Sequence, residues 1–246
     1  MLDSVADRLL IPRKPGLDLM NEPDLDIHAI DEILSDQAKL ATALNSVQGG
    51  ASKQFRPIKQ NTIKGMGSVW DYRRFTQANG GRIKVMGLVE HIPVIRQMVG
   101  RADLDVLWRV LRSQGLMVHN ATDGEGNVAL FVPMNLLCYH ARGGNSFLCG
   151  TEHMHATILD KWSDKQLNAA AFISYRANEH HDVPRRRGAL GPGAGFCTVR
   201  KRGHVTHEGV SRNAGFNDRS DPGTKYEALM GEVADRALFF GKHHRF

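Results

Sequence analysis

From residue 82 onward, short apolar segments alternate with longer segments of helical spacing, and this alternation limits the possible folds more than any other feature. The expected strands cover residues 83–89, 116–119 and 128–132, and the expected helices cover residues 104–114, 164–178 and 225–240. Ser163 is placed to cap the second of these helices. Strands that alternate with helices are typical of α/β domains, in which helices cover a central sheet.

The first 81 residues differ from the rest of the chain. Apolar residues at helical spacing predict one helix over residues 24–45. Residues 51–81 are polar and rich in glycine, with Trp70, Tyr72 and Phe75 as the obvious apolar anchors. We therefore expect an N-terminal extension over residues 1–81, made of a helix and an irregular arm, followed by a domain over residues 82–246. Within that domain, residues 188–196 (GALGPGAGF) are expected to form a flexible loop.

Composition narrows the function classes. With 41% hydrophobic and 24% charged residues, the 246-residue chain has the composition of a soluble globular protein. It lacks both a run of about 20 apolar residues and the features of a secretory signal at its first residues, so we expect synthesis in the cytosol. Three cysteines without CxxC spacing argue against a disulfide framework and against a cysteine metal site.

The net charge of +6 indicates a polyanionic partner, such as nucleic acid, an anionic membrane or an anionic cell wall. The densest basic runs, residues 185–187 and 200–202, lie among glycines and prolines and have few aromatic neighbours. We interpret both runs as solvated loops and expect no nucleic-acid partner.

Histidine and carboxylate residues near the C-terminus suggest a metal site. His207 and Asp221 are separated by a loop that can fold back, and His91 follows an apolar strand. Two neutral imidazoles and one carboxylate would hold zinc and leave a fourth position for water, whose pKa the metal lowers. His204 is an alternative to His207, and Asp218 is an alternative to Asp221.

Seven segments between residues 82 and 240 occur in the order found in one known family. They are LVEH (88–91), MVH with DG and LFVP (117–133), YHARG (139–143), NSFLCGTE (145–152), WSDKQ (162–166), THEGV (206–210) and RSDPG (219–223). Together they resemble the type-2 N-acetylmuramoyl-L-alanine amidases, a family that includes phage amidases, bacterial recycling amidases and peptidoglycan recognition proteins. The resemblance implies a mixed central β-sheet flanked by helices, with the N-terminal extension attached.

The resemblance also implies roles for individual residues. His91, His207 and Asp221 would hold Zn²⁺, and a water on the metal would attack the amide between N-acetylmuramic acid and L-alanine. Glu152 matches the acidic general base of the family. The simpler interpretation of Glu152 is a buried acid paired with His119 or His153. Arg219 stands where many members carry a lysine that stabilises the oxyanion, although arginine is not equivalent to lysine.

The same resemblance assigns Tyr139, His140, His119 and Asn145 to the substrate groove, with Tyr139 in place of the family's tryptophan. The expected protein is a monomeric zinc amidase of the phage endolysin type, which acts on the bacterial cell wall after release and does not insert stably into membranes. A cytosolic recycling amidase is a variant of this interpretation. The alternatives are a peptidoglycan-binding module without activity and a zinc peptidase that acts on the stem peptide.

Overall fold

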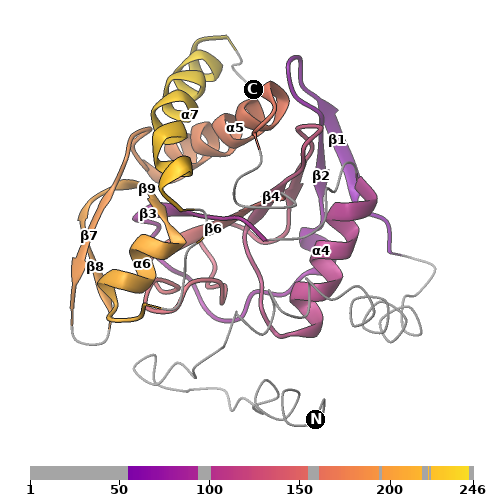
Figure 1. Ribbon diagram of the computed structural model, residues 1–246. Coiled ribbons are helices and arrows are strands. Elements are labelled where there is room, and N and C mark those ends of the chain that lie inside the picture. The colour runs from indigo at the N-terminus through magenta and orange to yellow at the C-terminus, as the bar shows by residue number, and fades with distance from the viewer. Residues whose placement is uncertain are drawn as a thin grey trace.

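A seven-stranded β-sheet runs through the centre of the protein, and helices cover both of its faces (Figure 1). The computed structural model describes residues 55–93, 101–154, 161–193, 196–217, 221 and 223–243. The sheet contains β1 (Ile58–Thr62), β2 (Ser68–Asp71), β3 (Gly87–His91), β4 (Asn120–Thr122), β5 (Val128–Leu130), β6 (Leu148–His153) and β9 (Gly203–Thr206). The helices are α4 (Arg101–Ser113), α5 (Asp164–His181), α6 (His207–Asn213) and α7 (Gly223–His243).

The strand order in the sheet is β1-β2-β5-β4-β6-β3-β9. The four strands β4, β6, β3 and β9 are parallel to their neighbours within this half of the sheet. The β1–β2 and β4–β5 pairs are antiparallel, whereas β2 and β5 are parallel. The predicted fold class, a mixed central sheet flanked by helices, is therefore confirmed.

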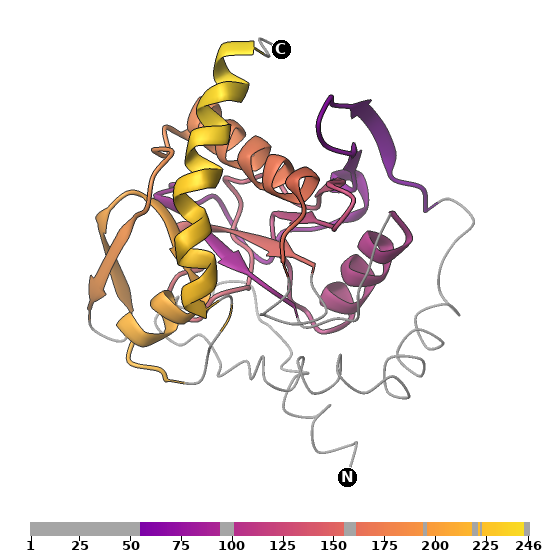
Figure 2. The same ribbon diagram turned by 45° about the horizontal axis from the view of Figure 1, so that its top comes forward.

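Each face of the sheet packs on its own pair of helices. Helices α5 and α7 lie side by side over one face, as both views show (Figures 1 and 2). Their apolar residues form a continuous core with the sheet residues Leu88, Leu130 and Cys149. Helix α4 packs on the opposite face over Ala121 and Ala129, and α6 packs there over Val89. None of the described helices is both long and apolar enough to cross a membrane.

The expected helix of residues 164–178 is observed as α5, and its N-terminus has the predicted cap. The Ser163 hydroxyl accepts a hydrogen bond from the Gln166 amide at 3.1 Å, which satisfies a backbone donor that the first helical turn leaves unpaired. The helix ends at Asp182, which adopts the left-handed conformation with φ of 54°. The cap therefore fixes where this helix begins on the sheet.

Several segments differ from the sequence-based expectations. The expected strand of residues 83–89 begins only at Gly87, as β3, and the expected strand of residues 116–119 is not observed, since the nearest strand is β4, Asn120–Thr122. Residues 58–71 were expected to be an irregular arm but form β1 and β2, because β2 pairs with β5 and buries Val69 in the core. Residues 189–192 were expected to be part of a flexible loop but form strand β7 (Ala189–Pro192), because they pair with β8 (Cys197–Lys201). The expected helix of residues 24–45 lies outside the described residues. The division of the chain after residue 81 stays a prediction.

A buried carboxylate joins three strands beneath α5. Glu90 of β3 is 2% exposed, and its two carboxylate oxygens accept hydrogen bonds from His153 Nε2 of β6 at 2.7 Å and from His204 Nδ1 of β9 at 2.6 Å. Burial would raise the pKa of Glu90, but the two imidazole hydrogen bonds outweigh it and lower the pKa to about 2. The outer ring nitrogens bond to Thr122 and Ser174. Glu90 therefore holds β6, β3 and β9 in register as an anion.

Gly87 permits the close approach of β3 and β9. A Cβ atom at this position would lie 2.6 Å from the Gly203 carbonyl oxygen and 3.1 Å from Leu148 Cδ2. Because the nearest atom belongs to the β9 backbone, only a shift of the strands could relieve the contact.

Gly87→Ala is expected to lower the free energy of unfolding by about 1–3 kcal/mol, because overpacking forces backbone shifts. Gly81→Ala is the matched control, since a Cβ atom at that position would meet nothing within 4 Å, and a change below about 0.5 kcal/mol is expected. Urea unfolding of both variants measures the difference. Equal stabilities would contradict the close contact between β3 and β9.

Candidate metal centre

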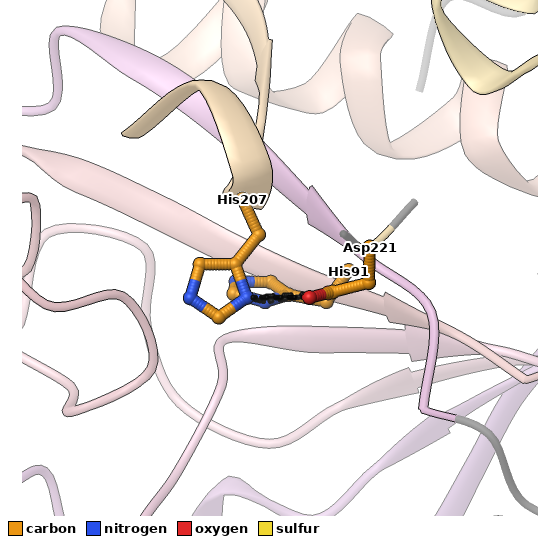
Figure 3. Close-up of side chains that lie close together, drawn as sticks. All are labelled: His91, His207 and Asp221. Carbon is orange, nitrogen blue, oxygen red and sulfur yellow. Dashed lines mark hydrogen bonds and ion pairs between the residues drawn. The ribbon is translucent and has the colours of Figure 1, made fainter. Parts of the chain in front are cut away.

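Three side chains from distant parts of the sequence meet at one end of the sheet (Figure 3). His91 is the last residue of β3, His207 is the first residue of α6, and Asp221 precedes α7. His91 Nδ1 lies 3.0 Å from His207 Nδ1 and 3.7 Å from Asp221 Oδ2. His207 Nδ1 lies 3.2 Å from the same carboxylate oxygen. In the part of the chain that the structure describes, this is the group of histidine, cysteine and acidic side chains that could hold a metal ion.

The strand geometry of β3 separates its two polar residues. Successive side chains of a strand point to opposite faces, so Glu90 lies beneath α5 while His91 points to the other side of the sheet. Both are nearly fully buried, His91 at 3% exposure. The same alternation makes Glu90 structural and leaves His91 facing His207 and Asp221.

Backbone contacts place the other two residues. Thr206 caps α6 by accepting a hydrogen bond from the Gly209 amide at 3.0 Å, which fixes His207 at the first helical position. The backbone carbonyl of Asp221 accepts a hydrogen bond from the Glu208 amide at 2.9 Å. The segment before α7 is thus tied to the start of α6, and Asp221 lies next to His207.

A chain of hydrogen bonds determines which nitrogen of His91 faces the cluster. The Leu148 carbonyl oxygen can only accept, so His140 Nε2 must donate to it across 3.2 Å. In neutral His140 the Nδ1 atom is then an acceptor, and it receives the Nε2 proton of His91 across 3.2 Å. His91 is therefore left with a lone pair on Nδ1, directed at His207 and Asp221.

Gly150 makes room for this chain. A Cβ atom there would lie 2.5 Å from His140 Nδ1 and 2.6 Å from His140 Cγ. The ring of His140 thus occupies the space that any side chain at position 150 would fill. The absence of a side chain at Gly150 lets His140 lie directly behind His91.

Burial and local charge set the protonation of the cluster. Burial, and then the neighbouring charge of His207, lower the pKa of His91 to about 4. Burial, followed by the charge of His91, also lowers the pKa of His140 well below its ordinary value. Burial would raise the pKa of Asp221, but the charge of His207 and the hydrogen bond from His207 lower it. At neutral pH the cluster therefore presents neutral His91 beside an ionised carboxylate.

The three donor atoms fit a tetrahedral divalent cation. Zinc–nitrogen and zinc–oxygen bonds of about 2.0–2.1 Å separate neighbouring ligand atoms by about 3.3 Å in a tetrahedral site. The observed separations of 3.0, 3.2 and 3.7 Å bracket this value. Without a cation, one proton on His207 Nδ1 can be shared with the two acceptors, His91 Nδ1 and Asp221 Oδ2. A bound cation would replace that proton. The residues present thus have the number, type and spacing that zinc requires.

Glu152 lies beside the cluster. It is partly buried on β6 and pairs in register with His91 of β3, so the two side chains share one face of the sheet. His153, the next residue, uses both ring nitrogens to bond Glu90 and Thr122 on the other face. The role of Glu152 as a general base stays a prediction.

The alternative ligand His204 lies away from the cluster. Its two ring nitrogens bond to Glu90 and to Ser174 of α5, so its ring is held beneath α5. The structure therefore brings His207, and not His204, together with His91. Asp218 and Arg219 lie outside the described residues, and the expected role of Arg219 stays a prediction.

The residues assigned to a substrate groove take different positions. His140, His119 and Asn145 are at most 5% exposed, and their side chains bond to protein groups. Asn145 Oδ1 accepts from the His140 and Ala141 amides. His119 accepts from the Gly150 amide and donates to the Leu136 carbonyl. These three lie behind the cluster, whereas Tyr139 is half-buried. Their direct contact with substrate stays a prediction.

Sequence reasoning missed two residues of this centre. Glu90 was considered only as part of the segment that precedes His91, and His140 was assigned to the groove. A charged residue that interrupts an apolar strand was the available signal for Glu90, since buried charges need partners. No local pattern marks His140, because its contact with His91 spans 49 residues of sequence.

No protein-family model matches the sequence, and no curated protein has significant sequence similarity to it. Some solved structures are partly similar to its fold. The hydrolase AmiA of Staphylococcus aureus is 15% identical with a TM-score of 0.47, and the match covers 95% of this chain and 97% of AmiA. The endolysin amidase LysCS of Clostridium intestinale is 13% identical with a TM-score of 0.46, over 70% of this chain and 98% of LysCS.

The peptidoglycan recognition protein PGRP-SA of bumblebee is 19% identical with a TM-score of 0.39, over 46% of this chain and 75% of its own. LysCS and PGRP-SA carry the names of two groups of proteins that the sequence motifs resemble. At TM-scores below 0.5, the activity of the chain must be argued from the residues of its own site.

The buried His119 is expected to make stability depend on pH. Burial lowers its pKa from 6.5 to about 4, so between these values the unfolded chain binds a proton that the folded chain does not. This contribution to stability is complete above pH 6.5 and is lost as the pH falls toward 4. It amounts to about 3 kcal/mol between pH 8 and pH 4.

His119→Gln keeps an acceptor for Gly150 and a donor for Leu136, and it cannot titrate. Urea unfolding at pH 8, 6 and 4 should therefore show a smaller loss of stability on acidification in this variant than in the parent chain. The same loss in both proteins would mean that other groups account for the acid sensitivity.

Proposed function

We propose that the chain is a zinc-dependent N-acetylmuramoyl-L-alanine amidase of the type-2 family. The observation that carries this proposal is the convergence of His91 Nδ1, His207 Nδ1 and Asp221 Oδ2 within 3.0–3.7 Å of one another. Glu152, in register with His91, adds a carboxylate on the same face of the sheet. Two histidines and a carboxylate, with a second acid beside them, form the donor set of a hydrolytic zinc site.

His91, His207 and Asp221 would hold the ion. When bound, zinc supplies a Lewis acid that polarises the scissile carbonyl and activates water. The hydrogen-bond chain through His140 keeps the Nδ1 lone pair of His91 directed at the site, as partners behind a ligand histidine commonly do. The ionised Asp221 contributes negative charge, so the ligand set neutralises part of the charge of a divalent cation.

Glu152 is the proposed general base. It would accept a proton from the attacking water and deliver it to the nitrogen of L-alanine as the amide bond breaks. Its place on β6 supports this role, because pairing with β3 fixes the backbone of Glu152 relative to that of His91. Arg219 is proposed to stabilise the negative charge that develops on the carbonyl oxygen.

The proposed substrate is peptidoglycan, and the proposed biological role is that of a phage endolysin that reaches the cell wall after release. The net charge of +6 supports attraction to anionic wall polymers. Tyr139 is proposed to contact substrate, and its partial exposure supports this role. The chain is proposed to act as a monomer.

Zinc content provides the first test. His207→Ala is expected to abolish zinc binding because it removes one of three ligands, and His140→Ala is expected to weaken it about 10–100-fold because His91 loses its orienting partner. His204→Asn should retain zinc, since an amide NH₂ can replace the Nδ1 donor to Glu90. Metal analysis after dialysis against a zinc buffer measures all three. Zinc loss in the His204 variant, with retention in the His207 variant, would overturn the ligand assignment.

Activity provides the second test. Digestion of purified peptidoglycan should release stem peptides that begin with L-alanine, as identified by mass spectrometry. Glu152→Gln is expected to keep bound zinc and to lower the rate by at least about 100-fold, because it removes proton transfer and leaves the metal ligands. Shorter peptides would instead identify a stem-peptide peptidase. A zinc-loaded chain that binds peptidoglycan and releases nothing would be a recognition module.

A further inference from the structure

A cavity with both polar and apolar lining residues lies on the α5 side of the sheet, on the face opposite to His91. Its volume is about 260 Å³, slightly below the range of about 300–1,000 Å³ typical of sites for drug-sized ligands. Helix α5 contributes residues near its C-terminal end, and the rest come from the turn after β2, from β4, and from β5 and the segment after it. The polar side chains that line the cavity are Arg73, Arg176, His180, His181, Asn120 and Asn135. Every one of them can donate a hydrogen bond, and none is a carboxylate.

The guanidinium of Arg176 has no close acceptor among the residues that the structure describes. It forms no hydrogen bond or ion pair with any residue that the structure describes, and its Nε atom is buried without an acceptor among them. Its nearest described ring contact is Phe172, 5.8 Å from the guanidinium carbon. A second cavity of about 330 Å³, beside β1 and β2, also reaches Arg176. Arg176 thus lines both cavities.

The nearby carboxylate is already engaged. Asp71 accepts hydrogen bonds from Arg73 Nε at 2.9 Å and from Arg73 Nη2 at 2.6 Å, a bidentate pair. Burial, and then the charge of Arg73, lower the pKa of Arg176. The charge of Asp71 offsets only part of this effect. Because a partly desolvated charge without a close acceptor is costly, an anion that entered the cavity would be attracted to Arg176.

We propose that this cavity binds a phosphate group. Donors surround it from α5, from Asn120 of β4 and from Asn135, and a tetrahedral oxyanion can accept from several directions at once. A guanidinium binds phosphate oxygens in bidentate fashion. A carboxylate has two oxygens in one plane and could use fewer of these donors. The group can belong to free phosphate or to a phosphodiester polymer. This site is independent of the proposed zinc chemistry.

Thermal unfolding of the full chain tests the proposal. Titration with inorganic phosphate at constant ionic strength is expected to raise the Tm by about 3–5 °C at ten times the dissociation constant. Arg176→Gln should abolish this shift, and Arg176→Lys should weaken binding at least tenfold because lysine lacks the planar fork. Arg112→Gln is the matched control, since it removes one positive charge from the exposed surface of α4 on the other face.

Three further arms separate the possible outcomes. His207→Ala should keep the full phosphate shift, which separates this cavity from the metal centre. Acetate should not raise the Tm. Poly(glycerol phosphate) should raise it if the natural source of the phosphate group is a polymer. A rise with inorganic phosphate alone would identify free phosphate as the ligand. The proposal is overturned if phosphate stabilises the Arg176→Gln variant as much as the parent, if acetate alone stabilises the chain, or if no anion does.

Discussion

The buried carboxylate of Glu90 is the interaction on which the rest of the structure depends. It joins β3 to β6 through His153 and to β9 through His204. Burying a carboxylate costs several kcal/mol unless its oxygens are bonded, and here each oxygen has an imidazole donor. Removing one partner from a buried network of this kind typically costs about 3–5 kcal/mol. The arrangement is therefore strongly selective for one register of three strands.

That register also brings together the residues of the candidate metal centre. Each residue of the Glu90 network is a close neighbour in sequence of a residue at the site: Glu90 precedes His91, His153 follows Glu152, and His204 lies three residues before His207. Strand side chains alternate between faces. The side chains beneath α5 therefore hold the strands together, while those on the other face form the candidate metal centre. A shift by one residue would exchange the two sets.

The sequence could predict the parts of this site that depend on local pattern. His91 at a strand end, His207 after a threonine cap and Asp221 before Pro-Gly all lie in short motifs, so their proximity could be predicted from the order of those motifs. The order of the motifs also favoured His207 over His204, but the physical reason could not be predicted, because it lies in the partners Glu90 and Ser174, 114 and 30 residues away from His204. Strands β1 and β2 were missed because their pairing with β5 gives no signal in a polar, glycine-rich segment.

The face beneath α5 contains a buried anion, Glu90, and a partly buried cation, Arg176, and their surroundings differ. Glu90 has two donors within 2.7 Å, whereas Arg176 has no acceptor among the described residues and borders two cavities. A buried anion stabilises a fold when the protein itself supplies its hydrogen-bond donors, as His153 and His204 do for Glu90. Arg176, in contrast, borders a cavity with further hydrogen-bond donors and has no acceptor there. Its partial desolvation is therefore not compensated, and it does not stabilise the fold as Glu90 does. The difference between these two charges is the reason to look for the ligand of Arg176 outside the chain.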